Sequence, residues 1–370
     1  YTYSVQTNTW EAIRMADYFE ERTKKFAVDE FNEVADFPKN ALIELTNACN
    51  HKCIFCKNSS QIRKTTKIDF KLYKKFITEA VSLGLEEVGL YATGEPFMTD
   101  NLHDFIFYAK DSGVRRVYLT TNGSLASLDR VQQCYEAGLD SIKYSINAGN
   151  ASDYFAVHRF NDFEKVLKNV KDVHNWVSKN NLSLQMLGSC VSIPAFPNTH
   201  EQHKAIFGDL FENTDYVIAH SQGGQMYDLC ETESHLSLVF DEHVFSHNDK
   251  DEIKPCDMLW NRYHVTAEGY LTSCCVDYDL NLVFGSMNEG KLADLWNSET
   301  IKKLRRKHIS SDLKGTICDQ CLHNRRADYD PLMLVDMKLK KESHIDKESA
   351  DLSKRFSDLK VTNLVEDVII

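Results

Sequence analysis

The chain has 370 residues, of which 42% are hydrophobic, enough for a substantial buried core and for two or three domains. Its formal net charge of -12 disfavours general binding to nucleic acid, because an acidic surface repels the phosphate backbone. No apolar run approaches the roughly 20 residues that span a bilayer, and residues 1–30 lack the apolar core of a signal peptide. We therefore predict a cytoplasmic protein that binds neither nucleic acid nor membranes.

Strand and helix patterns alternate along the first two thirds of the chain, after an N-terminal helical extension over residues 1–40. The predicted strands lie at 41–47, 88–93, 116–122, 141–147, 182–190 and 215–220, and the predicted helices at 70–83, 101–112, 127–137, 163–179 and 200–211. Strands that alternate with helices lie parallel and are joined by right-handed crossovers. Six such units over residues 41–222 predict an α/β fold, a partial (β/α)6 TIM-like barrel with functional side chains at the carboxyl ends of its strands.

The remaining chain divides by composition into three parts. We predict a linker over 223–255, a cysteine-rich domain over 256–325 and a charged, helical C-terminal tail over 326–370, to which no function is assigned. The eleven cysteines lie at positions 49, 53, 56, 134, 190, 230, 256, 274, 275, 318 and 321. An odd count in a long chain argues against a disulfide framework, and the clustering indicates metal binding.

Cys49, Cys53 and Cys56, hereafter the first cysteine group, follow the first predicted strand with the spacing C-x3-C-x2-C. Three thiolates on one short loop can ligate three irons of a cubane [4Fe–4S] cluster and leave the fourth iron open to a cofactor or substrate. A zinc site is the alternative. Zinc takes four ligands in structural sites, so His51 or a distant residue would have to supply the fourth.

This spacing resembles the signature of the radical S-adenosylmethionine (SAM) superfamily, and the resemblance covers about residues 38–222. In that family the open iron binds SAM, which is cleaved to methionine and a 5′-deoxyadenosyl radical that abstracts a hydrogen atom from the substrate. The resemblance implies SAM as a cofactor and an external low-potential electron donor such as flavodoxin or ferredoxin. It also implies that Phe55, just before the third cysteine, flanks the adenine of SAM.

Further stretches at successive strand ends carry the same resemblance. The segment Gly94-Glu95-Pro96 resembles the family's GGEP motif, in which the glutamate holds the SAM amino group, although Thr93 replaces the first glycine. A carboxylate at a strand end accepts strong hydrogen bonds from an ammonium group. The SAM contacts implied by the resemblance are Phe55, Gly94, Glu95, Ser145, Asn147 and Leu187. Individually, these residues are also typical of turns, N-caps and polar strand positions.

A second cysteine group, Cys256, Cys274, Cys318 and Cys321, lies in the C-terminal third, with a Leu-Trp-Asn segment between its two halves. The pattern resembles the auxiliary-cluster domains called SPASM and their shortened form, twitch. Four cysteines suffice for one fully ligated [4Fe–4S] cluster, so the resemblance implies a single auxiliary cluster. A four-cysteine zinc site is the alternative. Cys275 is adjacent to a ligand, and we expect its side chain to point away from Cys274 if the segment is extended.

Twitch enzymes resembling this chain oxidise or epimerise aminocyclitols and aminoglycosides. We therefore predict an oxidoreductase or epimerase for a small polar substrate such as a sugar, aminocyclitol or nucleotide sugar, with Cys275 and Cys190 as candidate hydrogen donors. Peptide or protein maturation is an alternative. We expect it less, because peptide maturases often carry a longer recognition domain before the barrel. A non-catalytic iron–sulfur or zinc protein is the alternative of another class.

Overall fold

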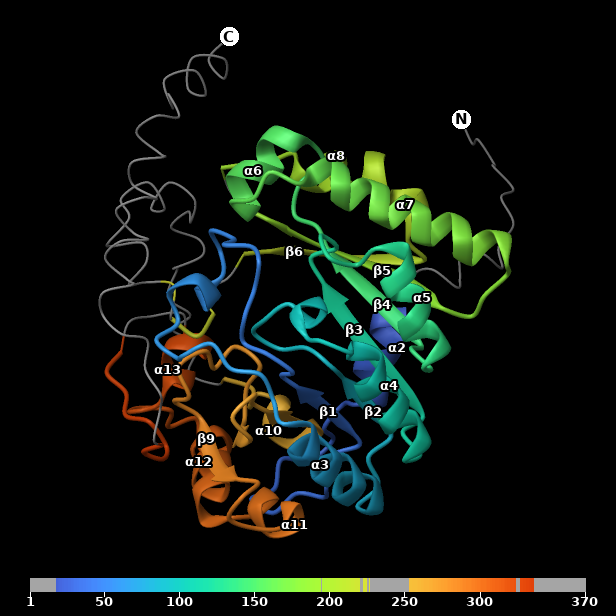
Figure 1. Cartoon of the computed structure of the whole chain (residues 1–370). Coiled ribbons are helices and arrows are strands. Elements are labelled where there is room, and N and C mark those ends of the chain that lie inside the picture. Colours follow the sequence, from blue (N-terminus) through green and yellow to red (C-terminus); the bar gives the residue numbers. More distant parts are fainter. Residues whose placement is uncertain are drawn as a thin grey trace, which may run out of the picture.

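The structure is a computed structural model, and it describes residues 18–193, 195–219, 222–224, 226, 253–323 and 327–335. Its centre is a nine-stranded sheet with the strand order β6-β5-β4-β3-β2-β1-β7-β8-β9. Strands β1 to β6 pair in parallel, and helices α3 to α8 lie along the outer side of this part of the sheet (Figure 1). The partial barrel predicted from the sequence is therefore confirmed.

The observed bounds follow the predicted ones closely. The parallel strands are β1 (Asn40–Ile43), β2 (Glu87–Gly89), β3 (Arg116–Thr121), β4 (Ser141–Ser145), β5 (Gln185–Ser192) and β6 (Asn213–Ile218). The helices between them are α3 (Phe70–Ser82), α4 (Leu102–Asp111), α5 (Leu128–Glu136), α6 (Ala151–His158), α7 (Phe163–Lys179) and α8 (Thr199–Phe207), with short 3-10 turns η1 (Lys57–Ser60), η2 (Pro96–Met98) and η3 (Gly208–Leu210). Helix α6 has no counterpart in the sequence prediction.

The alternation of burial along β3 shows which side of the sheet faces the core. Val117 and Leu119 are buried in the hydrophobic core, whereas Tyr118 and Thr120 are only half-buried. Because successive side chains point to opposite faces of a strand, the first pair lies under the helices and the second pair faces the barrel interior. The side chains that β3 directs to the barrel interior therefore carry polar groups and are only partly covered.

Helix α2 (Tyr18–Lys25) lies beside the amino ends of the strands. Its Arg22 and Lys25 both form ion pairs of 2.5 Å with the buried Glu87 of β2. The Arg22 guanidinium also lies over the ring of Tyr118, 4.9 Å from its centroid. This helix therefore covers the interior at the end of the barrel opposite the first cysteine group.

The strands of the cysteine-rich region extend the barrel sheet. Strand β7 (Arg262–Val265) pairs in parallel with β1, and the antiparallel strands β8 (Tyr270–Thr272) and β9 (Val283–Ser286) follow it. These strands have three or four residues, too few for a periodic pattern to reveal them. The first and second cysteine groups consequently belong to one continuous sheet.

Aromatic packing holds the cysteine-rich region to the barrel. Its helices are α10 (Met258–Asn261), α11 (Leu292–Trp296), α12 (Glu299–Ile309) and α13 (Ile317–Leu322). The ring of Trp296 stacks on Tyr263 of β7 at 4.9 Å, and Tyr263 also contacts Phe76 of α3. Burial of three large aromatic side chains in one cluster contributes several kcal/mol, on the scale of about 1.5–3 kcal/mol for each large apolar side chain.

A buried ion-pair network, named here the Arg63 network, joins the same two regions. Arg63 follows the first cysteine loop and is 1% exposed. Its guanidinium binds Glu44, directly after β1, with contacts of 2.6 and 3.2 Å, and Glu268, between β7 and β8, with contacts of 2.6 and 3.2 Å. Glu44 also accepts a 2.6 Å hydrogen bond from the Thr93 hydroxyl. Both carboxylates are thus bound in a forked geometry by one cation.

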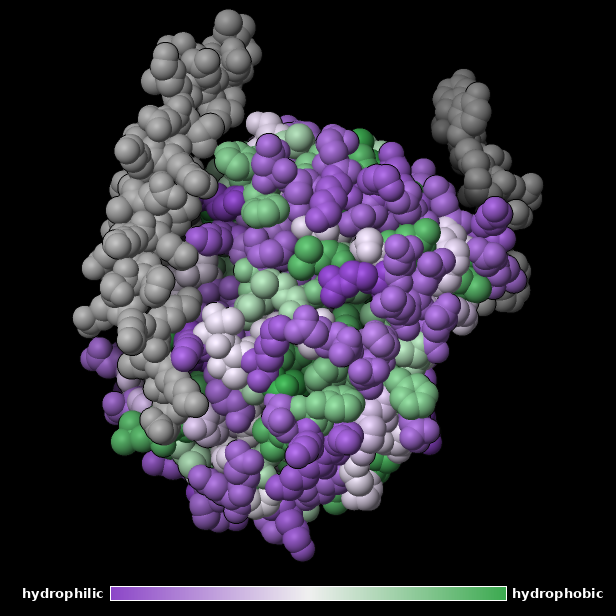
Figure 2. Space-filling model, in the orientation of Figure 1, coloured by the Kyte–Doolittle hydropathy of each residue, from purple (hydrophilic) through white to green (hydrophobic). Residues whose placement is uncertain are grey.

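Parts of the predicted organisation lie outside the described residues. They include most of the N-terminal extension, nearly all of the predicted linker with Cys230, and the tail beyond residue 335. Among the residues that the structure does describe, no helix has both the length and the apolar character needed to cross a bilayer. Figure 2 shows mostly hydrophilic side chains on one face, with apolar side chains in small separate groups.

Candidate iron–sulfur and SAM site

The loop that carries the first cysteine group leaves the carboxyl end of β1 and is held by buried amide side chains. Asn58 of η1 donates hydrogen bonds to the carbonyl oxygens of Asn47 and Thr93 at 2.9 and 2.7 Å. The Asn47 side chain in turn accepts from the backbone N–H of Thr66 at 2.8 Å. Because these amides saturate the backbone groups at both ends of the loop, the three cysteines keep a fixed position above the sheet.

Each thiol of the first cysteine group has one polar neighbour. Cys49 lies 3.9 Å from the Asn122 amide, Cys53 lies 3.4 Å from His158 Nδ1, and Cys56 lies 3.3 Å from the Tyr278 hydroxyl. Burial raises the pKa of Cys49 to about 12, and it raises the pKa of Cys53 and Cys56 as well. Thiolates are unfavourable here without a cation. The donor set therefore fits a metal centre that supplies positive charge to three sulfurs.

Gly94 and Glu95 lie directly against the cysteine loop. A Cβ atom at Gly94 would meet the Thr46 carbonyl oxygen at 2.2 Å, so only glycine allows this approach of the two backbones. The Glu95 N–H donates to the Ala48 carbonyl at 2.8 Å. The segment after β2 is therefore fixed next to Cys49, which is where the sequence places a contact to the amino group of SAM.

The Glu95 carboxylate is buried and already accepts three hydrogen bonds. Its donors are the Thr121 hydroxyl at 2.7 Å, the Asn122 N–H at 2.8 Å and the Phe97 N–H at 3.1 Å. Burial raises the pKa of Glu95, and these donors work against that effect. Since a carboxylate has about four lone-pair positions, one remains for a further donor such as an ammonium group.

The other implied SAM contacts lie on β4, β5 and the loops beside them. Asn147 is buried, and its side-chain oxygen accepts the Val191 N–H at 2.8 Å. Ser145 is half-buried at the end of β4, and Leu187 lies one strand further, in register with Lys143. Phe55 packs against a small cluster that contains Ile54 and Val157. Phe55, Ser145 and Asn147 lie at the carboxyl side of the parallel sheet, on the side of the first cysteine group, whereas Leu187 is the third residue of β5 and lies in the amino half of that strand.

From the sequence alone, His158 is equally well a substrate-binding residue or an exposed loop residue. In the structure it is 1% exposed at the end of α6. Its Nε2 accepts the Asn147 N–H at 3.0 Å, so Nε2 carries no proton and Nδ1 is the protonated nitrogen. That Nδ1 faces Cys53 Sγ at 3.4 Å and His51 Nδ1 at 3.3 Å. Burial lowers the pKa of His158 well below its ordinary value, in agreement with a neutral ring. His158 therefore links Asn147 to a cysteine of the first group.

His51, the alternative fourth zinc ligand, lies in the same cluster. Its Nε2 is 3.4 Å from Asp162 Oδ2, and its ring stacks on Phe160. The ligand atoms of His51, Cys53 and His158 lie within 4.8 Å of one another, so these three side chains are also arranged to hold a metal ion. Because His158 Nε2 accepts the Asn147 N–H, its Nδ1 is protonated and would have to lose that proton before it could bind zinc.

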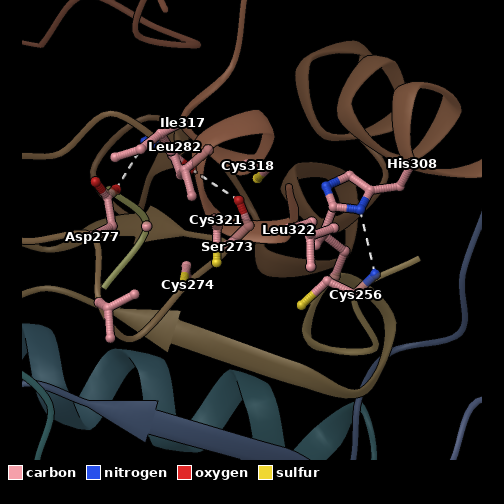
Figure 3. A pocket seen from close by; sticks show the side chains of 13 residues that line it. Cys256, Ser273, Cys274, Asp277, Leu282, His308, Ile317, Cys318, Cys321 and Leu322 are labelled. Atoms are coloured by element: carbon pink, nitrogen blue, oxygen red, sulfur yellow. Dashed lines mark hydrogen bonds between the residues drawn. The ribbon is translucent and has the colours of Figure 1, made fainter. Parts of the chain in front are cut away.

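The second cysteine group surrounds one cavity. Figure 3 shows the labelled side chains of Cys256, Cys274, Cys318 and Cys321 around it, with about 460 Å³ of space between atoms. Burial raises the pKa of Cys318 and Cys256, and it raises that of Cys321 to about 11. As in the first group, buried thiols of raised pKa fit a cationic centre, and four sulfurs complete the ligand set of one cubane cluster.

The two candidate hydrogen donors occupy different places. The expectation that the Cys275 side chain points away from Cys274 is wrong, because the two thiols form a hydrogen bond with each other. Cys275 also interacts with His264 and Arg262 of β7, and Cys274 lines the cavity of the second group. Cys190 of β5 is in register with Tyr216 of β6, and both lie on the face that α8 covers. Burial raises the pKa of Cys190 to about 12. The position of Cys190 is that of a core thiol, and only Cys275 is near the cysteine groups.

Comparison with known proteins identifies both regions. Residues 43–208 match the radical SAM superfamily, and residues 256–322 match the iron-sulfur cluster-binding domain SPASM. The chain is 25% identical over 263 residues to a probable GTP 3′,8-cyclase of Methanocaldococcus jannaschii, which covers 65% of this chain and 86% of that protein. It is 23% identical over 284 residues to the S-adenosyl-L-methionine-dependent 2-deoxy-scyllo-inosamine dehydrogenase of Niallia circulans, which covers 75% of this chain and 90% of that protein.

Other similarities are partial or concern the fold alone. The match to a PqqA peptide cyclase of Methylorubrum populi, 29% identical, covers 33% of this chain and 31% of that protein. The crystal structure of BtrN in complex with AdoMet and 2-DOIA superimposes with a TM-score of 0.50 at 19% identity, over 75% of this chain and 89% of that one. SuiB of Streptococcus suis bound to its precursor peptide SuiA gives 0.56 at 14% identity, over 82% and 74%.

The domain matches and the two cysteine groups agree on the cofactors. They are SAM, a [4Fe–4S] cluster at the first cysteine group and an auxiliary iron–sulfur cluster at the second. The chain therefore contains a radical SAM domain at residues 43–208 and an iron–sulfur cluster-binding SPASM domain at residues 256–322.

Proposed function

We propose that this radical SAM enzyme oxidises or epimerises a small polar substrate, such as a sugar, an aminocyclitol or a nucleotide sugar, at a carbon that bears a hydroxyl group. The proposal is based on the similarity to the 2-deoxy-scyllo-inosamine dehydrogenase, and this similarity extends over 90% of the length of that protein. The names of the GTP 3′,8-cyclase and PqqA peptide cyclase relatives point to other substrates, a nucleotide and a peptide. The substrate class therefore has to be tested separately from the cleavage of SAM.

The proximity of the two cysteine groups supports oxidation. Tyr278, four residues after Cys274, places its hydroxyl 3.3 Å from Cys56 of the first group. With its cluster and SAM bound, the first group supplies the electron that cleaves SAM. In an oxidation, the substrate C–H hydrogen goes to the 5′-deoxyadenosyl group, the hydroxyl proton goes to solvent, and one electron must leave. The auxiliary cluster that the second group would hold is the acceptor that we propose for this electron.

Epimerisation would need a hydrogen atom returned to the opposite face of the carbon, and Cys275 is the donor that we propose for it. Its thiol lies beside Arg262 and His264, which face the barrel interior. Cys190 is the matched control, because the same substitution there changes only a thiol on the helix-covered face. Loss of solvent deuterium incorporation in Cys275→Ala but not in Cys190→Ala is the outcome that assigns the donor.

The test is product analysis with anaerobically reconstituted protein, SAM and dithionite. We expect wild type to form 5′-deoxyadenosine, and Glu95→Gln to form at least about tenfold less, because a buried charged acceptor is lost. With a panel of sugars and aminocyclitols, oxidation lowers the substrate mass by two hydrogens, and epimerisation leaves it unchanged. Fully loaded wild type that releases no 5′-deoxyadenosine would overturn the enzyme assignment. A modified peptide in place of a modified sugar would overturn the substrate class.

A separate prediction concerns the hydrogen bond from His158 to Cys53. Hydrogen bonds to cluster sulfurs raise the reduction potential, because they stabilise the added electron. We therefore expect His158→Phe to shift the midpoint potential of the first cluster to a more negative value, measured by a redox titration followed by EPR. His203→Phe is the control, since His203 is equally buried but packs on Phe207 of α8. Unchanged potentials in both variants would show that His158 only fills space.

A further inference from the structure

The inner face of β7 carries two polar side chains that the SAM and cluster chemistry does not use. Tyr263 and Val265 belong to the hydrophobic core, so Arg262 and His264, which alternate with them, point to the barrel interior. His264 is 2% exposed. Neither of its ring nitrogens makes a hydrogen bond of normal geometry within the described part of the chain, although the Cys275 thiol lies nearby.

Arg262 also lacks a partner, in its case one of opposite charge. No carboxylate of the described residues pairs with it, and its Nε is buried without a hydrogen bond. The acidic groups closest along the sheet are already bound elsewhere, Glu44 by Arg63 and Glu87 by Arg22 and Lys25. A partly buried guanidinium without a counter-charge is costly, and polar groups that are buried and unpaired call for a ligand or water.

Arg262 and His264 lie on the inner face of the barrel, in register with Asn40 and Leu42 of β1. The Tyr118 hydroxyl, on the inner face of β3, donates a 2.8 Å hydrogen bond to Asn40, the residue opposite Arg262. Burial raises the pKa of Tyr118 and of Tyr91, two residues beyond β2, and the positive charge of Arg262 opposes this effect. Arg262 and His264 therefore belong to the barrel interior, between α2 and the loop of the first cysteine group.

We propose that Arg262 and His264 bind an anionic group of the substrate, a carboxylate or a phosphate. A guanidinium offers a fork of N–H donors that matches both groups, and His264 adds a ring N–H from the neighbouring inward position. The proposal rests on the enzymatic function above and narrows its substrate class. It makes an acidic sugar, a sugar phosphate or a nucleotide sugar the expected substrate, and it disfavours a neutral or cationic aminocyclitol.

The first test is binding of inorganic phosphate and of acetate to the reconstituted, SAM-loaded enzyme, measured by anaerobic calorimetry. We expect saturable binding of one of these anions to wild type. Phosphate alone would indicate a phosphorylated substrate, and acetate alone a carboxylate. We expect Arg262→Gln to weaken this binding about tenfold or more, the loss of one charge-assisted pair, and Arg262→Lys to restore part of it.

Two controls separate this proposal from its alternatives. Arg306→Gln removes the same charge from an exposed ion pair with Glu33 and should bind anions like wild type. Arg306→Gln should also keep its slow, substrate-free formation of 5′-deoxyadenosine, and the iron content of Arg262→Gln shows whether that variant is folded and loaded. No saturable anion binding to wild type, or equal binding to Arg262→Gln, would overturn the proposal. A wild type that binds anions but does not cleave SAM would instead overturn the proposed function.

Discussion

Replacing the three cysteines of the first group with alanine is expected to lower the iron content of the reconstituted protein from about eight to about four atoms per chain. The four cysteines of the second group line a cavity of their own and share no ligand with the first group. The reciprocal variant, with the second group replaced, should therefore also retain about four. Only the second-group variant should keep an EPR signal that changes when SAM is added, because only the first group leaves an iron open.

Cys134→Ala is the control, because it removes a buried thiol of α5 that belongs to neither cysteine group. We expect its iron content to equal that of wild type. Zinc in place of iron at the second group would replace the auxiliary cluster with a structural site and remove the electron acceptor from the proposed oxidation. Zinc at the first group, held with His51 and His158, would contradict the SAM site itself.

Replacing Arg63 with methionine is expected to lower the free energy of unfolding by about 3–5 kcal/mol. Arg63 is the single cation between Glu44 and Glu268, and all three side chains are held between β1 and the β7–β8 turn. Removing it leaves two carboxylates close together, one of them fully buried. The measurement is the midpoint and slope of urea unfolding, followed by tryptophan fluorescence under anaerobic conditions.

Arg306→Met is the matched control, since its ion pair with Glu33 is exposed and should be worth less than about 1 kcal/mol. A combined variant in which Arg63, Glu44 and Glu268 all become apolar should recover part of the loss, because no charge then remains unpaired. An Arg63→Met variant as stable as wild type would show that water or a protonated carboxyl group takes over the role of the guanidinium.

The barrel was predictable because its elements are long and periodic. Helix α7 was predicted at its observed bounds, and the predicted strand 116–122 ends one residue beyond β3. The first cysteine group was recognisable because its three ligands lie within eight residues of sequence. The resemblance placed Gly94 and Glu95 beside it, and the contact with Ala48 shows why a glycine is needed there.

What the sequence concealed depends on contacts between distant segments. His158 is the last residue of a helix too short to be recognised from the sequence, and it packs against the cysteine loop at Cys53, which lies 105 residues earlier in the chain. Strand β7 has four residues, and nothing local shows that it pairs with β1. Tyr278 and Arg262 carry no motif. Their positions became clear only when the cysteine-rich region was seen to continue the sheet.

The pairing of β7 with β1 affects how the chain folds during its synthesis. Strand β1 begins at residue 40, and its partner β7 begins at residue 262, so the inner edge of the barrel stays unpaired until more than half of the chain has left the ribosome. An unpaired strand edge is a site for association with other chains, and pairings of large sequence separation form slowly. A fragment that ends before residue 262 would therefore contain the complete SAM-binding motifs and still expose the edge of β1. Expression of the SAM domain alone should yield aggregation-prone protein that becomes well behaved when residues 253–323 are supplied on the same chain.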